Sequence, residues 1–91
     1  MKLIIGDLEF SIGGIRVTSQ QRFSATYQLW GIDDVLVQWA ENALLSKSEF
    51  NLEIVNGSDV VLIGEHCLFN RPDRLNRSTD LIVNWVEKSL I

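Results

Sequence analysis

The chain has 91 residues, of which 46% are hydrophobic and 22% are charged, and its formal net charge is −4 at pH 7. This composition is ordinary for a globular fold and excludes intrinsic disorder. Ninety-one residues suffice for one domain, which we expect to span 1–91. The net negative charge repels phosphate backbones at long range, so it disfavours nucleic acid as a partner.

Cysteine content and the first residues bear on the compartment. The chain has a single cysteine, Cys67, which rules out an internal disulfide, so the fold needs no oxidising compartment. Residues 1–10 carry one lysine and a short apolar run, too little for a signal peptide, and no later run is long enough to cross a membrane. We therefore expect a cytoplasmic protein without a membrane segment.

The first third of the chain alternates between apolar and polar residues, which is the pattern of half-buried strands. The alternation covers 8–12, 15–19 and 22–29, and Gly13-Gly14 predicts a tight hairpin turn between the first two segments. We expect a three-stranded antiparallel meander with one wet face, which residues 2–5 extend or supplement with a short strand. The residues expected to point inward are Leu8, Phe10, Ile12, Ile15, Val17, Phe23, Ala25, Tyr27 and Leu29.

Residues 31–48 change to the spacing of an amphipathic helix. Asp33 and Asp34 lie where an N-cap or the positive end of the helix dipole favours acids, and Lys47 lies near the opposite end. The apolar face of this predicted helix consists of Ile32, Val35, Leu36, Trp39, Ala40, Ala43 and Leu44.

Residues 50–63 form a hairpin around Asn56-Gly57, the strongest short signal for a two-residue turn. With this turn, Val60 and Leu62 lie on the same sheet face as Asn51 and Glu53. The other face carries Leu52, Val61 and Ile63. Either the strand is central and covered on both faces, or the next loop folds over it, or a second copy meets it. We predict a two-fold homodimer with Val60 and Leu62 near the contact.

Residues 78–91 predict a second amphipathic helix, capped by Ser78 or Thr79. Its apolar stripe consists of Leu81, Ile82, Trp85, Val86 and Leu90. The expected element order is therefore βββαββα. This order predicts an α+β fold, a two-layer sandwich with an antiparallel sheet of about five strands and two helices on one face.

Residues 64–78 are expected to form a long loop that holds one or two helical turns beginning near Pro72. Arg71, Arg74 and Arg77 recur every three residues, which would gather their side chains on one side of such a turn. Guanidinium groups suit carboxylates and phosphates, so the loop predicts an anion or acidic-partner contact. The alternatives are pairing with the chain's own acids, or solvation.

The remaining candidate residues give no catalytic or metal site. His66 and Cys67 are neighbours in an extended segment, so they point to opposite faces, and the chain has no second histidine to act as base. One cysteine and one histidine are also too few for a zinc site. Trp39 is expected in the core with Trp85, whereas Trp30 either anchors an interface or staples the core beneath the first helix.

These observations predict a small protein-binding module without enzymatic activity, metal or cofactor, such as an inhibitor, an immunity-type protein or an accessory subunit. Its expected partner-binding residues are Arg71, Arg74, Arg77 and Trp30. The alternative is nucleic-acid or nucleotide contact through the same three arginines.

Overall fold

The structure is a computed structural model that describes residues 1–89, within which one sheet of seven strands is accompanied by one helix. In chain order the elements are β1 (Lys2–Ile5), β2 (Leu8–Ser11), β3 (Gly14–Gln20), β4 (Ala25–Trp30), α1 (Asp34–Ser46), β5 (Phe50–Asn56), β6 (Asp59–Asp73) and β7 (Ser78–Ser89). The predicted sandwich of about five strands and two helices is therefore wrong. Within residues 1–89 the structure contains no helix whose length and apolar content together would let it span a membrane.

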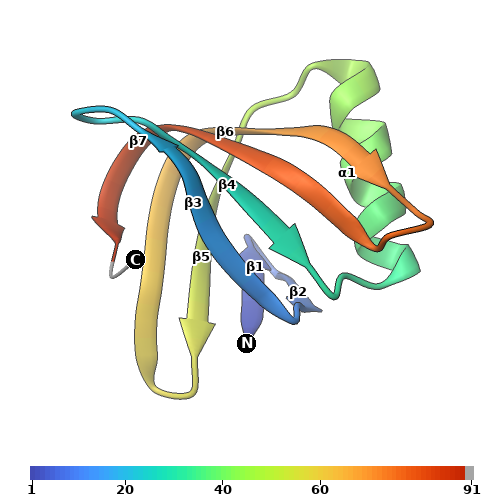
Figure 1. Cartoon of the computed structure of the whole chain (residues 1–91), viewed down its shortest axis with the longest axis horizontal. Coiled ribbons are helices and arrows are strands. Elements are labelled where there is room, and N and C mark those ends of the chain that lie inside the picture. Colours follow the sequence, from blue (N-terminus) through green and yellow to red (C-terminus); the bar gives the residue numbers. More distant parts are fainter. Residues whose placement is uncertain (90–91) are drawn as a thin grey trace.

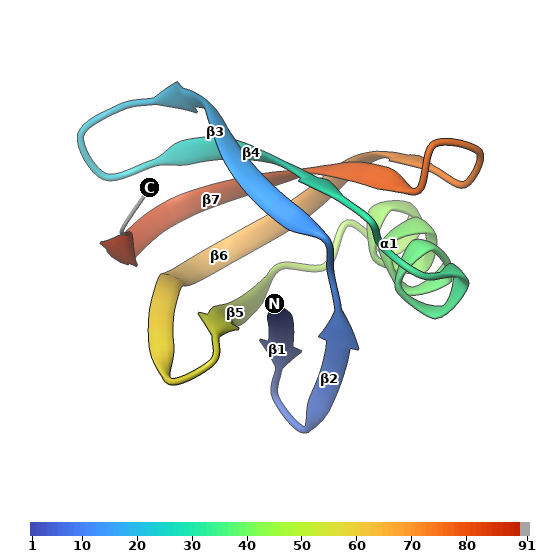
Figure 2. The ribbon, with the colours of Figure 1, turned by 60° about the horizontal axis from the view of Figure 1, so that its bottom comes forward.

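All neighbouring strands are antiparallel, in the order β2-β1-β5-β6-β7-β4-β3. Although β2 and β3 are consecutive in the chain, they form the two edges of the sheet. Ile12 donates its backbone N–H to Met1 at 3.0 Å, and Gly13 donates to Trp30 at 2.8 Å. The sheet therefore curls until its edges meet at Ile12 and Gly13, and Figure 2 shows the continuous path from β2 into β3. The predicted hairpin at Gly13-Gly14 is wrong.

Helix α1 was predicted correctly and closes the core beside the tip of the β6–β7 hairpin (Figure 1). Asp33 is its N-cap, and its carboxylate accepts the Leu36 N–H at 2.8 Å. Trp39 is half-buried at the centre of an aromatic cluster, with ring centroids 6.4 Å from Phe10, 5.0 Å from Phe50 and 5.8 Å from Phe69. The helical residues that are fully buried are Leu36, Val37 and Ala40, whereas Val35, which the spacing places inward, is exposed.

The segment predicted as a second helix is strand β7, through residue 89. Thr79, Leu81 and Val83 are buried at every second position, and β7 pairs with β6 on one side and β4 on the other. The predicted loop 64–78 is also wrong, because β6 continues to Asp73 and β7 begins at Ser78. Leu90, which was assigned to the helical stripe, lies outside the described residues.

The β5–β6 hairpin exists, but its predicted register is wrong. Asn56 pairs with Asp59, so Gly57 and Ser58 are the central turn residues, and Gly57 takes the left-handed conformation with φ of 64°. A bulge then places Val55 opposite Val60 and Ile54 opposite Leu62. A shift of this kind moves side chains to the other sheet face.

Several side chains predicted to point inward are exposed. They are Leu8 on β2, Val17 on β3, Phe23 before β4 and Trp85 on β7. The core itself consists of residues from all seven strands and the helix, and its largest fully buried members include Tyr27, Phe69, Leu3, Leu29 and Ile32.

Candidate functional site

The three predicted arginines lie at the tip of the β6–β7 hairpin rather than on a helical turn. The Asp73 carboxylate accepts the backbone N–H groups of Leu75 and Asn76 at 3.0 and 3.1 Å and the Asn76 amide at 2.8 Å. These hydrogen bonds lower the pKa of Asp73 below its usual value. Arg71 and Arg77 have positive φ angles of 50° and 52°, which are incompatible with the predicted helical turn.

The three arginines make different contacts. Arg74 Nη2 lies 2.6 Å from Glu41 Oε1 and Arg74 Nη1 lies 3.8 Å from Asp34 Oδ1, so this guanidinium ties the hairpin tip to α1. Arg71 and Arg77 are exposed, and within residues 1–89 neither forms an ion pair. Pairing with the chain's own acids therefore occupies Arg74 and leaves the other two available.

Trp30 is half-exposed at the end of β4 and packs on the backbone of β3. A Cβ added to Gly14 would lie 2.2 Å from Trp30 Cζ2, so the absence of a side chain at Gly14 makes room for the ring. The ring is held in place without being buried, which keeps Trp30 a candidate contact residue.

Val60 and Leu62 do not form the surface that was predicted for them. Leu62 is 0% exposed and lies in the core opposite Ile54, because the bulge reverses its orientation, while Val60 is half-buried opposite Val55. The predicted exposure of Leu62, on which its role in a dimer contact depended, is therefore wrong. The homodimer itself stays a prediction.

His66 and Cys67 do not form a catalytic pair. Cys67 is fully buried, and desolvation, together with the charges of Glu49 and Glu65, raises the pKa of its thiol to about 12. His66 is exposed on a bulge with φ of 54°, and its Nδ1 lies 3.8 Å from Glu49 Oε1. Within the described residues, no group of three or more His, Cys, Asp or Glu side chains is placed to hold a metal ion.

A surface that sequence reasoning missed lies where the β3–β4 turn meets β7. The rings of Phe23 and Trp85 stack with centroids 4.7 Å apart and planes 15° apart, and Arg22 Cζ lies 4.9 Å from the Phe23 centroid. Phe23 is 46% exposed and Trp85 is 39% exposed. We call these three residues the aromatic stack. The alternating pattern assigned Phe23 to the core. The one sequence signal for exposure is its position next to Arg22, near the start of the predicted strand.

The aromatic stack borders the side of β1, β5 and β6 that faces away from the core. Cross-strand pairs join Ile4 to Glu53, Glu53 to Ile63, and Glu65 to Trp85, and paired side chains point to the same side of a sheet. Ile4 and Ile63 are half-buried and line a hollow of about 290 Å³. We call this surface the outer face, and it consists of Lys2, Ile4, Glu9, Glu53, Ile63, Glu65, Trp85 and Lys88.

Another hollow, of about 400 Å³, lies between the end of α1 and the β6–β7 pair. Its lining is largely apolar, with one lysine and one glutamate, and consists of Leu44, Lys47, Glu49, Leu68, Phe69, Asn70 and Ile82.

Comparisons with protein-family models, curated proteins and solved structures find no match.

Proposed function

We propose that the chain is a small protein-binding module without enzymatic activity, of the inhibitor, immunity-type or accessory-subunit kind, and that it binds its partner through the aromatic stack. The observation that carries the proposal is the stacking of two half-exposed aromatic rings, Phe23 and Trp85, beside Arg22. Tryptophan and arginine are the side chains most enriched among the residues that dominate binding energy at protein interfaces.

The backbone of Phe23 and the ring of Trp85 are held in position before any partner arrives. The Phe23 carbonyl accepts the Val86 N–H at 2.8 Å, and the Trp85 indole N–H donates to Glu87 Oε1 at 2.7 Å. A side chain that is already ordered loses little conformational entropy on binding, so more of its contact energy appears as affinity. The buried single cysteine suits a reducing compartment, and we place the module in the cytoplasm.

The exposed Arg71 and Arg77 support a second candidate function, contact with nucleic acid or nucleotides. Two free guanidinium groups at a hairpin tip suit phosphate, and exposed aromatic rings stack with bases. Against it stand the net charge of −4 and the pairing of Arg74 with α1.

Capture from a lysate of the native host tests the proposal with the immobilised wild type and with Phe23→Ser and Trp85→Ser. Each substitution should weaken partner retention by about tenfold or more, which corresponds to about 1.4 kcal/mol. Leu75→Ser is the matched control, because Leu75 is 91% exposed on the β6–β7 turn and should leave retention unchanged.

Melting temperatures of the variants show that loss of binding is not loss of fold. Equal retention by the wild type and both aromatic variants would contradict the proposal. Retention that disappears after nuclease treatment, and that requires Arg71 and Arg77, would favour the second candidate instead.

A further inference from the structure

The outer face offers an apolar strip that ends at the aromatic stack. Ile4 and Ile63 flank Glu53 on the neighbouring strands, and the strip continues along β6 to the Glu65–Trp85 pair. Both isoleucines keep part of their surface in contact with solvent. A partner that contacts Trp85 would therefore also cover apolar side chains on β1 and β6.

Carboxylates surround this strip. Glu9 pairs with Ile4 across β2 and β1, Glu53 lies between the two isoleucines, and Glu65 pairs with Trp85. Within residues 1–89, no lysine or arginine nitrogen lies within 4 Å of these three carboxylates. They are therefore available to cations from another molecule.

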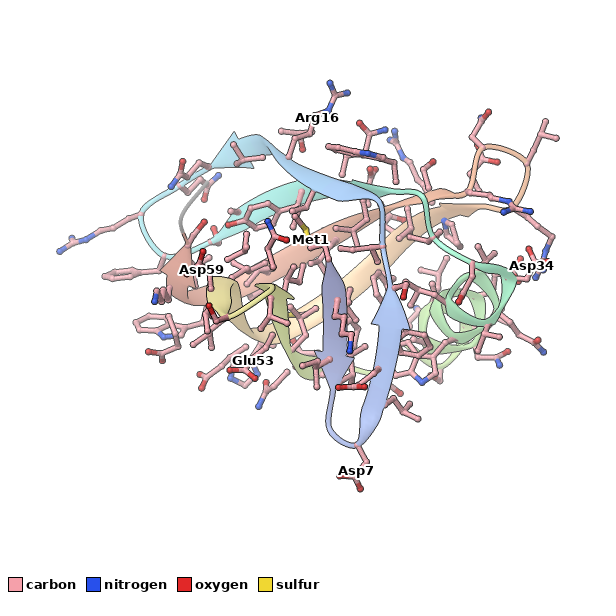
Figure 3. All side chains as sticks on the ribbon, turned by 90° about the horizontal axis from the view of Figure 1, so that it is seen from below. Met1, Asp7, Arg16, Asp34, Glu53 and Asp59 are labelled. Atoms are coloured by element: carbon pink, nitrogen blue, oxygen red, sulfur yellow. The ribbon has the colours of Figure 1, made fainter. Side chains whose placement is uncertain are left out.

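The turns that border the outer face add to its negative charge. Asp7 lies in the β1–β2 turn and Asp59 follows the β5–β6 turn. Figure 3 shows Asp7 and Glu53 on the lower side of the view, with Arg16 on the opposite side. The cations on or beside this face are Lys2, which pairs with Val55, Lys88, which pairs with Ile63, and Arg22 of the aromatic stack. Five carboxylates thus stand against two ammonium groups and one guanidinium group.

Four of the five arginines are placed away from the outer face. Strands β1, β2 and β5 contain none; Arg16 and Arg22 lie on β3 and in the turn after it, and the other three lie at the β6–β7 tip. Arg22 is the single arginine near the strip, where its guanidinium covers the Phe23 ring. Most guanidinium groups are therefore segregated from the outer face, which leaves an excess of negative charge on it.

We infer that the partner is a protein with a basic, lysine- or arginine-rich surface that docks on the outer face and the aromatic stack. The inference rests on the proposed function and specifies the chemistry of its partner. Complementary charge steers such a partner to the face and excludes acidic competitors, while the apolar strip and Trp85 supply the area that is desolvated on contact.

The probe for the test is a short fluorescein-labelled peptide of alternating lysine, leucine and arginine, whose binding to the intact chain is followed by anisotropy. Saturable binding that weakens as salt rises is the expected result, because exposed charge pairs are screened. Glu9→Gln, Glu53→Gln and Glu65→Gln, combined, should weaken it about tenfold or more. The control combines Asp34→Asn, Glu49→Gln and Asp80→Asn, which changes the net charge equally but lies off the outer face, and should change affinity less than about threefold.

Three results would overturn the inference. They are equal loss of affinity in the two triple variants, equal binding of a charge-reversed peptide of glutamate, leucine and aspartate, and absence of saturable binding by the basic peptide. If sedimentation shows a dimer that only the outer-face triple variant dissociates, and the basic peptide does not bind, a second copy covers the face and the inference is also overturned.

The natural partner separates this inference from the proposed function. A captured partner that requires Phe23 and Trp85 but tolerates the outer-face triple variant leaves the proposed function standing and overturns the basic-surface inference. A partner that tolerates Phe23→Ser and Trp85→Ser overturns the proposed function itself.

Discussion

Gly31 and Gly13 meet at the point where the two edges of the sheet come together. Gly31 has φ of 65°, and a Cβ built on it would lie 2.7 Å from the Gly13 Cα. The backbones at Gly13 and Gly31 are held close together, because Gly13 donates its N–H to Trp30, the residue before Gly31. The closure of the sheet therefore depends on the absence of a side chain at residue 31.

Gly31→Ala should lower the free energy of unfolding by about 3 kcal/mol, since the left-handed conformation costs a non-glycine residue about 1–2 kcal/mol and the clash adds to it. Gly57→Ala is the matched control, because Gly57 has nearly the same φ, 64°, but no atom within 4 Å of the added Cβ. Urea unfolding gives the loss of unfolding free energy for each variant, and the difference between the two losses is the cost of the clash. Equal losses would show that the edges of the sheet do not meet as described.

Cys67 should make stability depend on pH in the alkaline range. Its pKa is raised from 9.0 to about 12 in the folded chain, so between these values the unfolded state has lost a proton that the folded state keeps. Stability contributed by the neutral thiol is therefore fully present below about pH 9 and is lost as the pH rises toward 12.

Urea unfolding at about pH 8 and about pH 10.5 checks this expectation. Cys67→Ala, which removes the thiol, should show a smaller decrease in unfolding free energy than the wild type between the two pH values. Equal decreases would mean that other groups account for the alkaline loss and that Cys67 is not shielded from solvent.

At the scale of elements, the link between the β6–β7 hairpin and α1 depends on Arg74. Arg74→Gln should lower the free energy of unfolding by at most about 1 kcal/mol, because both of its ion pairs are partly exposed. Arg71→Gln, at an exposed position with no ion pair in the described chain, should leave stability unchanged. Thermal unfolding of both variants makes the comparison, and equal effects would argue against the tie to the helix.

The elements that sequence predicted well are those whose signals are local. Helix α1 has its cap at Asp33 and its buried face at Leu36 and Ala40 within one segment. Strand β4 alternates cleanly through Ala25, Tyr27 and Leu29, and all three are buried as predicted.

Strand β7 was mistaken for a helix because its apolar residues fit two periods. Leu81, Ile82, Trp85 and Val86 match helical spacing, whereas Thr79, Leu81 and Val83 match a strand. The choice is made by pairing with β6 on one side and with β4 on the other, and because β4 is distant in the chain, no local pattern contains that information. The ion pairs of Arg74 were unpredictable for the same reason, since its partners Asp34 and Glu41 lie on α1.

The missed aromatic stack has a similar cause. Phe23 and Trp85 were assigned to the core because each follows an apolar period, but Phe23 lies in the β3–β4 turn and Trp85 on the second half of β7, where both rings are partly exposed. Their contact joins residues 62 positions apart. Long-range placement thus decides both which aromatic residues are buried and which are offered to a partner.

At the scale of the whole molecule, substitutions at Leu62 and Val60 distinguish an effect on folding from an effect on self-association. Leu62→Glu would place a charge in the core, where Leu62 is fully buried, at a cost of at least about 4 kcal/mol, which approaches the total stability of a small domain. We expect this variant to unfold. Val60→Glu lies at a half-buried position beside the β5–β6 turn, and we expect it to remain folded.

Light scattering and circular dichroism on the two variants and the wild type, at micromolar concentration, then test the predicted homodimer. A wild-type dimer that Val60→Glu converts to a folded 10.3 kDa monomer places the contact at Val60. A wild type that is already a 10.3 kDa species contradicts the homodimer. A folded Leu62→Glu variant would instead contradict the burial of Leu62, and with it the bulged register that turns this side chain into the core.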